Sequence, residues 1–156
     1  MTYVHTQSDG WVYLTTILDL YSRKVIVQRL HIKATSQEVL KTLNIAFDSR
    51  QPSTELSIHS DLGVQFTSYS FEKVLSERKI THSYSRRATS YDNAVIEAYH
   101  ANLKKELIHH QLFKTFERAQ RAIQNYTNNF YNSSRLHSAI NYLTPNEAEM
   151  NFFKAG

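Results

Sequence analysis

The sequence predicts an α/β protein of the α+β kind, in which helices cover a mixed β-sheet. Residues 2–30 are rich in β-branched and aromatic residues and are divided by short turn signals, which is typical of an antiparallel meander. From residue 35 onward, segments with helical spacing of apolar residues alternate with short strand-like segments. A meander followed by such alternation implies a mixed sheet with helical cover.

The meander is predicted from three strand-like segments, over 2–6, 11–20 and 24–30. Ser8-Asp9-Gly10 separates the first two, and the Asp-Gly pair favours a tight hairpin. A second turn is expected near Asp19, because the following residues as far as Arg23 interrupt the apolar pattern. We interpret Asp9 and Asp19 as turn residues, with a salt bridge as the other option for Asp19.

Helix starts are marked by capping residues. Thr35 and Glu38 form one capping box, and Thr144 and Glu147 form another with a proline at the first helical position. Asp92 and Thr115 are predicted to cap the two helices between these boxes. The expected helices are 35–47, 70–78, 93–109, 115–131 and a last one from 145, and the expected later strands are 56–61 and 80–85. This element order is the one that the ribonuclease H-like fold uses.

Composition narrows the class of protein. The chain has 156 residues, no cysteine, a net charge of +4 and a pI near 9.3, with 41% hydrophobic residues. The absence of cysteine excludes a disulfide scaffold, a Cys-ligated metal and a thiol nucleophile. No apolar run approaches the roughly 18 residues of a membrane span, and the first residues lack a secretory signal. We therefore expect a cytoplasmic globular protein, and the basic pI mildly favours a polyanionic partner.

Two carboxylates occupy positions suited to metal chemistry. Asp61 follows an apolar strand and precedes Gly63, which permits a sharp turn. A carboxylate on a rigid strand end is well placed to hold a metal, although Asp also simply starts many turns. Glu97 lies one turn into the predicted helix that begins at residue 93, where the helix dipole would also favour a solvated Glu. Taken singly, each acid is better explained by its ordinary role.

Together with their neighbours, these residues resemble a known family. Asp61 and Glu97 are separated by thirty-five residues, and Lys104 follows seven residues after Glu97. Around them, four segments in order resemble the catalytic core of DDE-type bacterial insertion-sequence transposases, whose core is similar to that of retroviral integrase: 10–24, 59–68, 90–97 and 135–145. The resemblance runs from Met1 to about Glu149, and it implies the ribonuclease H-like fold.

The resemblance implies a metal-dependent site. Such enzymes use two Asp and one Glu to hold two Mg²⁺ or Mn²⁺ ions, and Asp61 and Glu97 match two of these ligands. In the family the first catalytic Asp stands immediately before the residue matched by Met1, so we expect this chain to lack that ligand. The implied organisation is one catalytic-core domain over 1–156, with an incomplete first strand and the helices of 115–156 as a C-terminal extension.

Basic residues near the acids point to DNA. Lys104 matches the family's DNA-contacting base, and Arg86 and Arg87 precede the Glu97 helix, where they would either hold a phosphate backbone or be solvated. His59 shares a strand face with Asp61 and would either orient a ligand or serve as a hydrogen-bonded structural residue. The expected partners are DNA and further copies of the chain, with no membrane and no small-molecule cofactor.

The resulting hypothesis is a transposase core for DNA nicking and strand transfer, impaired here because the first Asp is missing. The parent reaction is an in-line attack on phosphate without a covalent enzyme intermediate. A non-catalytic DNA-binding or oligomerising remnant is the main alternative, and the missing Asp favours it. A structure-specific nuclease of the same fold is the second alternative, and the 135–145 segment argues against it.

Overall fold

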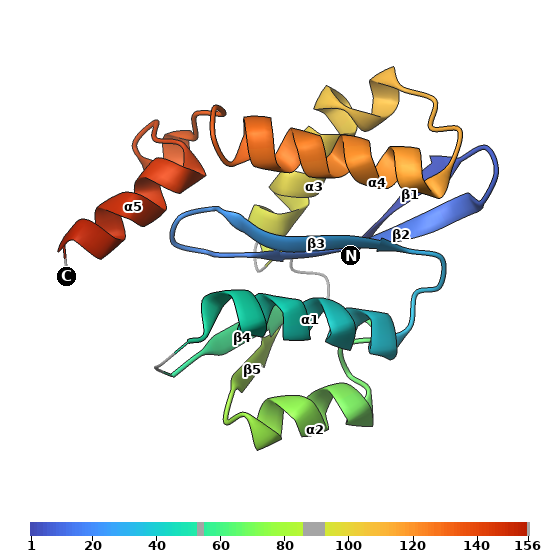
Figure 1. Cartoon of the computed structure of the whole chain (residues 1–156). Coiled ribbons are helices and arrows are strands. Elements are labelled where there is room, and N and C mark those ends of the chain that lie inside the picture. Colours follow the sequence, from blue (N-terminus) through green and yellow to red (C-terminus); the bar gives the residue numbers. More distant parts are fainter. Residues whose placement is uncertain (53–54, 86–92, 156) are drawn as a thin grey trace.

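The computed structural model describes residues 1–52, 55–85 and 93–155. Strands β1 to β3 and helix α1 come first, β4, α2 and β5 follow, and helical segments complete the chain (Figure 1). The elements in chain order are β1 (Thr2–Thr6), β2 (Gly10–Leu18), β3 (Val25–His31), α1 (Ser36–Arg50), β4 (Ser57–Ser60), α2 (Tyr69–Glu77), β5 (Thr81–Tyr84), α3 (Ala94–Glu106), η2 (Ile108–His110), α4 (Phe116–Asn125), η3 (Tyr126–Tyr131), η4 (Ser138–Ile140) and α5 (Pro145–Ala155).

The strands form both antiparallel and parallel pairs, which confirms the predicted α/β class. β1, β2 and β3 make an antiparallel meander in that order, with Val4 opposite Val12 and Leu14 opposite Leu30. β4 and β5 pair in parallel, with Ser60 opposite Tyr84. In the described part of the chain the two sets are separate sheets with no strand pair in common, so the expected single mixed sheet is divided.

Helices lie on both faces of the meander. In Figure 1, α3 and α4 lie above the β1–β3 sheet, and α1 lies below it with β4, β5 and α2 beyond. Apolar side chains of β1, β2 and β3 pack against Tyr99, Leu103 and Ile123 on the α3/α4 side. A second core joins Val39 and Leu43 of α1 to both sheets and α2. Each large aliphatic side chain buried in this way stabilises the fold by about 1.5–3 kcal/mol.

The predicted helix caps are present where the structure describes them. Thr35 accepts a hydrogen bond from Glu38 N at 3.3 Å, which places the start of α1 as predicted. In the second capping box, Thr144 Oγ1 accepts from Glu147 N at 3.3 Å and Glu147 Oε2 accepts from Thr144 N at 2.8 Å. Asp92 lies outside the described residues.

Of the two long helices predicted near the C-terminus, the first is shorter than expected and the second reaches Tyr131 as predicted but changes to a π-helix for its last turn. α3 ends at Glu106 and a 3₁₀ turn follows, where the pattern predicted a helix to residue 109. α4 ends at Asn125, and the chain continues as the π-helical segment η3 to Tyr131. Tertiary contacts explain the second change: Tyr126 donates to Glu106 Oε2 at 2.6 Å, and the buried Tyr131 ring packs edge-on against Tyr99. The spacing of apolar residues along the sequence cannot predict contacts of this kind.

Both early aspartates serve turns, as predicted. Asp9 Oδ2 accepts from the backbone N of Phe116 at 3.0 Å and thereby links the β1–β2 turn to the start of α4. Asp19 Oδ2 accepts from Ser22 N at 2.8 Å and from Ser22 Oγ, which closes the β2–β3 turn. Neither carboxylate is directed toward Asp61 by these contacts.

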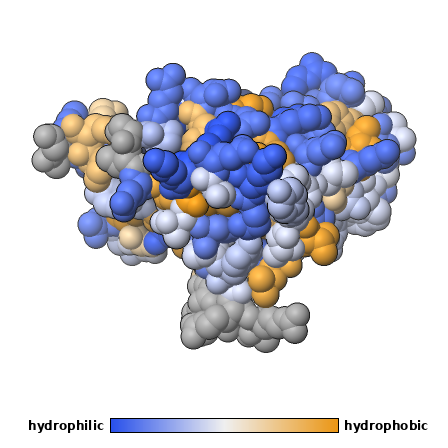
Figure 2. All heavy atoms as spheres, turned by 90° about the horizontal axis from the view of Figure 1, so that it is seen from below, coloured by the Kyte–Doolittle hydropathy of each residue, from blue (hydrophilic) through white to orange (hydrophobic). Residues whose placement is uncertain are grey.

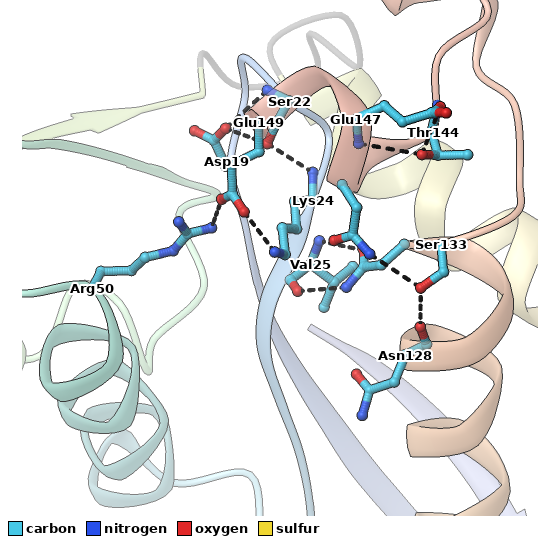
Figure 3. Close-up of polar contacts among 12 residues, drawn as sticks. Asp19, Ser22, Lys24, Val25, Arg50, Asn128, Ser133, Thr144, Glu147 and Glu149 are labelled. Atoms are coloured by element: carbon cyan, nitrogen blue, oxygen red, sulfur yellow. Dashed lines mark hydrogen bonds and ion pairs between the residues drawn. The ribbon is translucent and has the colours of Figure 1, made fainter. Parts of the chain in front are cut away.

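Helix α5 is attached to the rest of the fold by Glu149. This carboxylate pairs with Lys24 Nζ at 2.6 Å and with the guanidinium of Arg50, so one side chain joins α5, the start of β3 and the end of α1 (Figure 3). The three side chains are only partly exposed, so water screens these pairs less than it would on an open surface.

Figure 2 shows the face of the molecule that lies at the bottom of Figure 1, on the side of α2. This face is largely hydrophilic, and its apolar residues form small separate groups. In the described ranges, no helix combines the length and apolar character needed to cross a membrane.

One buried asparagine connects the helical layer to the meander. Asn132 is 3% exposed; its Oδ1 accepts from Val25 N and its Nδ2 donates to Val25 O, both at 3.0 Å. Its backbone oxygen also accepts from Asn146 N at 3.0 Å. Because the side chain supplies both a donor and an acceptor, it satisfies both backbone polar groups of Val25 at the start of β3.

We predict that Asn132→Ala lowers the free energy of unfolding by about 2 kcal/mol or more, since it leaves two buried backbone groups unpaired. Urea unfolding followed by circular dichroism measures this. Asn129→Ala is the matched control, because Asn129 is exposed, and its effect should stay within about 0.5 kcal/mol. Equal losses for the two variants would contradict the role assigned to Asn132.

Candidate active site

Asp61 directly follows β4 and is exposed. Its Oδ1 accepts a hydrogen bond from Gly63 N at 2.8 Å, which fixes the orientation of the carboxylate. A Cβ atom at position 63 would lie 2.8 Å from this same Oδ1, closer than such atoms approach in real proteins. A larger residue would therefore force the carboxylate out of this orientation, whereas the backbone of Gly63 is not in the left-handed region and sets no such demand.

Asp61 opens onto a pocket of 230 Å³ that also involves the start of β1. Its lining comes from Met1 and β1, from β2, from the connection between β3 and α1 and from the segment after β4: Met1, Thr2, Tyr3, Tyr13, Ala34, Asp61, Gly63, Gln65 and Phe66. Gln65 donates to Ala34 O at 3.1 Å and so links the Asp61 segment to the connection before α1. The pocket thus lies where the two sheets approach each other.

The α-amino group of Met1 lies at this pocket. Burial lowers its pKa, and the nearby Asp61 carboxylate opposes that shift by favouring the charged form. The same amino group depresses the pKa of His100 on α3, after the larger effect of burial. The first residue of the chain is therefore within electrostatic reach of both β4 and α3, and Figure 1 places the N-terminus near the middle of the molecule.

A polar network supports the end of β4 behind Asp61. Ser60 Oγ donates to Asp61 O at 2.9 Å and contacts His82 Nε2 at 2.9 Å. His82 Nδ1 in turn contacts Glu72 Oε1 at 2.7 Å. The order Ser60, His82, Glu72 resembles that of a serine nucleophile triad. However, Ser60 and the side chain of His82 are both buried, so this serine faces the interior. We interpret the network as a support that holds the β4 backbone in place.

His59 has the structural role that was one of its two expected roles. Its Nδ1 lies 2.7 Å from Ser83 Oγ and its Nε2 lies 3.1 Å from Ser85 Oγ. Both ring nitrogens are engaged across the β4–β5 pair, so the imidazole ties the parallel strands together.

Helix α3 carries Glu97 and Lys104. Glu97 is exposed in the first turn, and Lys104 follows two turns later on the same side, because seven residues span nearly two helical turns. Lys104 Nζ lies 4.6 Å from the centre of the Tyr3 ring, a cation–π contact. Since Tyr3 also lines the Asp61 pocket, Lys104 and Asp61 border the same part of β1.

The predicted site residues are therefore only partly joined by contacts. Asp61 and Tyr3 line the same pocket and Lys104 contacts Tyr3, whereas Glu97 has no hydrogen bond or ion pair with Asp61 among the contacts of the described residues. Within the described ranges, no group of three His, Asp or Glu side chains is arranged to hold a metal ion. Arg86 and Arg87 lie outside the described residues.

Comparison with known proteins identifies the family. Two family models, both described as an integrase core domain, match residues 1–90 and 78–145. The chain therefore belongs to the integrase core domain family. It is 32% identical to the transposase for insertion sequence element IS904 of Lactococcus lactis and 32% identical to transposase InsF for insertion sequence IS3A of Escherichia coli.

These relatives are longer than the chain. Each match covers 96% of this chain, but 58% of the Lactococcus protein and 51% of the E. coli protein. The chain thus spans about half the length of the curated relatives that it matches. Their shared sequence confirms the resemblance to insertion-sequence transposase cores.

Solved structures confirm the fold. The catalytic core domain of BIV integrase superposes with a TM-score of 0.67 at 23% identity and covers all of this chain and 96% of that one. The HTLV-2 integrase core in complex with magnesium gives a TM-score of 0.66 at 18% identity, over 94% of this chain and 90% of that one. The ribonuclease H-like fold class expected from the element order is therefore confirmed, and members of the integrase core family generally depend on divalent metal ions.

Several residues around the pocket did not emerge from the sequence as candidates. The pairing of Tyr3 with Lys104, the location of Met1 and the His82 network join residues far apart in the chain. One local signal was available: strict alternation in β1 turns Thr2, Val4 and Thr6 inward and leaves Tyr3 outside. An exposed aromatic residue on a strand beside a predicted site merits attention on that ground alone.

We predict that Gly63→Ala displaces the Asp61 carboxylate and weakens binding of Mn²⁺ at this pocket, because the added methyl group occupies the space next to Oδ1. Paramagnetic broadening of amide NMR signals near Asp61 during a Mn²⁺ titration measures the effect. Gly10→Ala is the control: its φ of 70° makes the substitution strained, but open space surrounds it. That variant should lose stability and keep the broadening, and loss of broadening in both variants would oppose the assignment.

The pKa of His100 predicts an acid-sensitive fold. Burial, followed by the charges of the Met1 amino group and Lys104, lowers this pKa to about 3. The unfolded chain takes up a proton near pH 6.5 while the folded chain does not, so stability is full above pH 6.5 and falls as the pH drops toward 3. The slope contributed by one such group reaches about 1.4 kcal/mol per pH unit.

His100→Gln can retain a hydrogen bond to Thr16, whose Oγ1 lies 3.3 Å from His100 Nε2. This variant should show a shallower loss of unfolding free energy between pH 7 and 4.5 than the unsubstituted protein. His110→Gln is the control, because His110 is exposed. If the two variants follow the same pH profile, His100 does not cause the acid sensitivity.

Proposed function

We propose that the chain is the catalytic core of a DDE-type transposase, which nicks donor DNA and joins the freed 3′ end to a target strand. The observation that carries the proposal is the pocket where Asp61, the start of β1 and the Tyr3–Lys104 pair meet. The pocket is lined by a carboxylate that follows a strand, and a cation for the DNA backbone, Lys104, contacts the lining residue Tyr3. The matched transposases support this assignment through their names and their sequence similarity.

In this reaction the oxygen of water attacks phosphorus in line, and the bond from phosphorus to the 3′ oxygen of the donor end breaks, which leaves a 3′-hydroxyl on that end and a 5′-phosphate on the flanking strand. In the second step the freed 3′-hydroxyl attacks a target phosphate and displaces a 3′ oxygen there. No bond to the enzyme forms. The tasks of the protein are therefore to position the phosphate and to stabilise charge on the attacking and leaving oxygens.

The donor set fits Mg²⁺ or Mn²⁺. Asp61 is an exposed carboxylate whose Oδ1 is oriented by Gly63 N, and Mg²⁺ favours sites with one or two carboxylates, several waters and a substrate phosphate. When bound, two divalent ions would activate the attacking oxygen and stabilise the leaving one. We propose Asp61 and Glu97 as protein ligands, and Lys104, with Arg86 and Arg87, as contacts to the DNA backbone.

The third carboxylate of the family motif belongs directly before the position matched by Met1. Two features support this placement: Met1 lines the Asp61 pocket, and its amino group interacts electrostatically with Asp61. A residue joined to that amino group would enter the same pocket. We therefore propose that an Asp at this position completes the metal site.

The alternative function is a DNA-binding or oligomerising module without catalysis. In the described ranges the acidic residues do not assemble into a three-ligand cluster, which favours this alternative for the chain in isolation. The two proposals differ in what an added Asp does, so a single extended protein distinguishes them.

We predict that a fusion carrying Asp directly before Met1 nicks supercoiled plasmid DNA in the presence of Mg²⁺ or Mn²⁺. Asp61→Asn and Glu97→Gln in this background should each reduce nicking at least 100-fold, because loss of an essential ligand typically costs orders of magnitude in rate. Gel quantification of nicked and joined DNA measures both steps, and joined products separate a transposase from a simple nuclease.

Two controls accompany this assay. A fusion with Asn in the added position should be as inactive as the chain itself, and Glu77→Gln, which removes an exposed carboxylate on α2, should leave nicking unchanged. Nicking that survives Asp61→Asn would refute the proposed site. DNA binding without nicking by the Asp fusion would support the non-catalytic alternative.

A further inference from the structure

Beside the proposed active site, the outer face of the β1–β2 hairpin exposes two large aromatic side chains. Tyr3 is 53% exposed and Trp11 is 58% exposed, although both belong to regular strands. Their ring centres lie 5.1 Å apart in an edge-to-face arrangement, and His5 lies 5.0 Å from Trp11 on the other side. We name Tyr3, Trp11 and His5 the aromatic row.

The aromatic row is continuous with the Asp61 pocket. Tyr3 lines that pocket, and Trp11 and His5 continue away from it along the hairpin. His5 lies opposite Trp11 in the β1–β2 register. The positions of the three rings are therefore set by the hydrogen-bonded strands of the hairpin. A ligand seated in the pocket would therefore extend naturally over these rings.

The positive charge of Lys104 beside the aromatic row indicates which class of ligand fits there. Lys104 Nζ rests 4.6 Å from the centre of the Tyr3 ring, so a cation stands at the junction of pocket and row. An apolar protein surface needs no cation at this point, whereas a nucleic acid strand presents a phosphate beside each base. Exposed aromatic rings beside basic groups are the usual means of binding single-stranded nucleic acid.

We propose that the aromatic row is a stacking platform for unpaired bases of a DNA strand whose phosphate lies in the Asp61 pocket. This inference rests on the proposed function and deepens it, since it assigns to Tyr3 and Trp11 the binding of bases next to the reacting phosphate. Stacking on π faces tolerates any base, so the row holds the strand open without reading its sequence.

Trp11 is the only tryptophan in the chain, so its emission reports on the row directly. The probes are ten-nucleotide oligothymidylate and an abasic strand of equal length, which carries the same phosphates without bases. Oligothymidylate should quench Trp11 emission in a saturable titration, because a base stacks on the indole. The abasic strand should bind through Lys104 and leave the emission nearly unchanged.

Affinity for labelled oligothymidylate, measured by anisotropy at fixed salt, separates the contributions. Tyr3→Ala and Trp11→Ala should each weaken binding about tenfold, and Trp11→Phe should retain most of it. Lys104→Ala should weaken binding of both strands and make it less dependent on salt. Tyr21→Ala is the matched control, because Tyr21 is 61% exposed in the turn that follows β2, and the affinity of this variant should not change.

Three results would overturn the inference. Equal quenching by both strands, or binding of oligothymidylate without any change in Trp11 emission, would show that no base stacks there. A shift of Trp11 emission that depends on protein concentration without DNA would show that the row joins copies of the chain. If the Asp fusion still nicks plasmid, the proposed function survives each of these results; if no DNA binds at all, both proposals fail.

Discussion

The geometry of the site depends on helix α1, which packs against two sheets that share no strand pair among the described residues. Its buried residues Val39 and Leu43 pack in one cluster with Ile17 of β2 and Ile58 of β4. The described strands form hydrogen bonds only within each sheet, so no strand pairing fixes the position of β4 relative to β1. The apolar contact with α1 fixes that position instead. The pocket between Asp61 and the Met1 end of β1 is thus a consequence of hydrophobic packing.

Helix α3 on the other face combines apolar packing with buried hydrogen bonds. The Tyr99 hydroxyl lies 2.5 Å from Gln28 Oε1 and 2.9 Å from Thr127 Oγ1, and the ring is almost completely buried. A buried hydroxyl with satisfied partners accepts only one placement of its helix, because any shift leaves polar groups unpaired. The same helix carries Lys104 to Tyr3 and presents Glu97 on its exposed side, so the core determines where the functional charges stand.

Motif spacing anticipated much of this arrangement. Asp61 stands at a strand end, Glu97 stands in the first turn of a helix, and the family resemblance is confirmed by the matched integrase core models. The role of Gly63 was only half anticipated: a turn signal is visible in sequence, but the demand for space beside Asp61 Oδ1 requires coordinates. Asn132 shows the same limit, since nothing local distinguishes it from the exposed asparagines around it.

By itself the sequence determined the element order, the capping of α1 and α5 and the alternation of β1, because each follows from neighbours within a few residues. Only the tertiary structure decided the division into two sheets, the π-helical end of α4, the approach of Met1 to Asp61 and the seating of Lys104 on Tyr3. These features arise from contacts between residues distant along the chain, and the packing that selects them leaves no periodic pattern in the sequence.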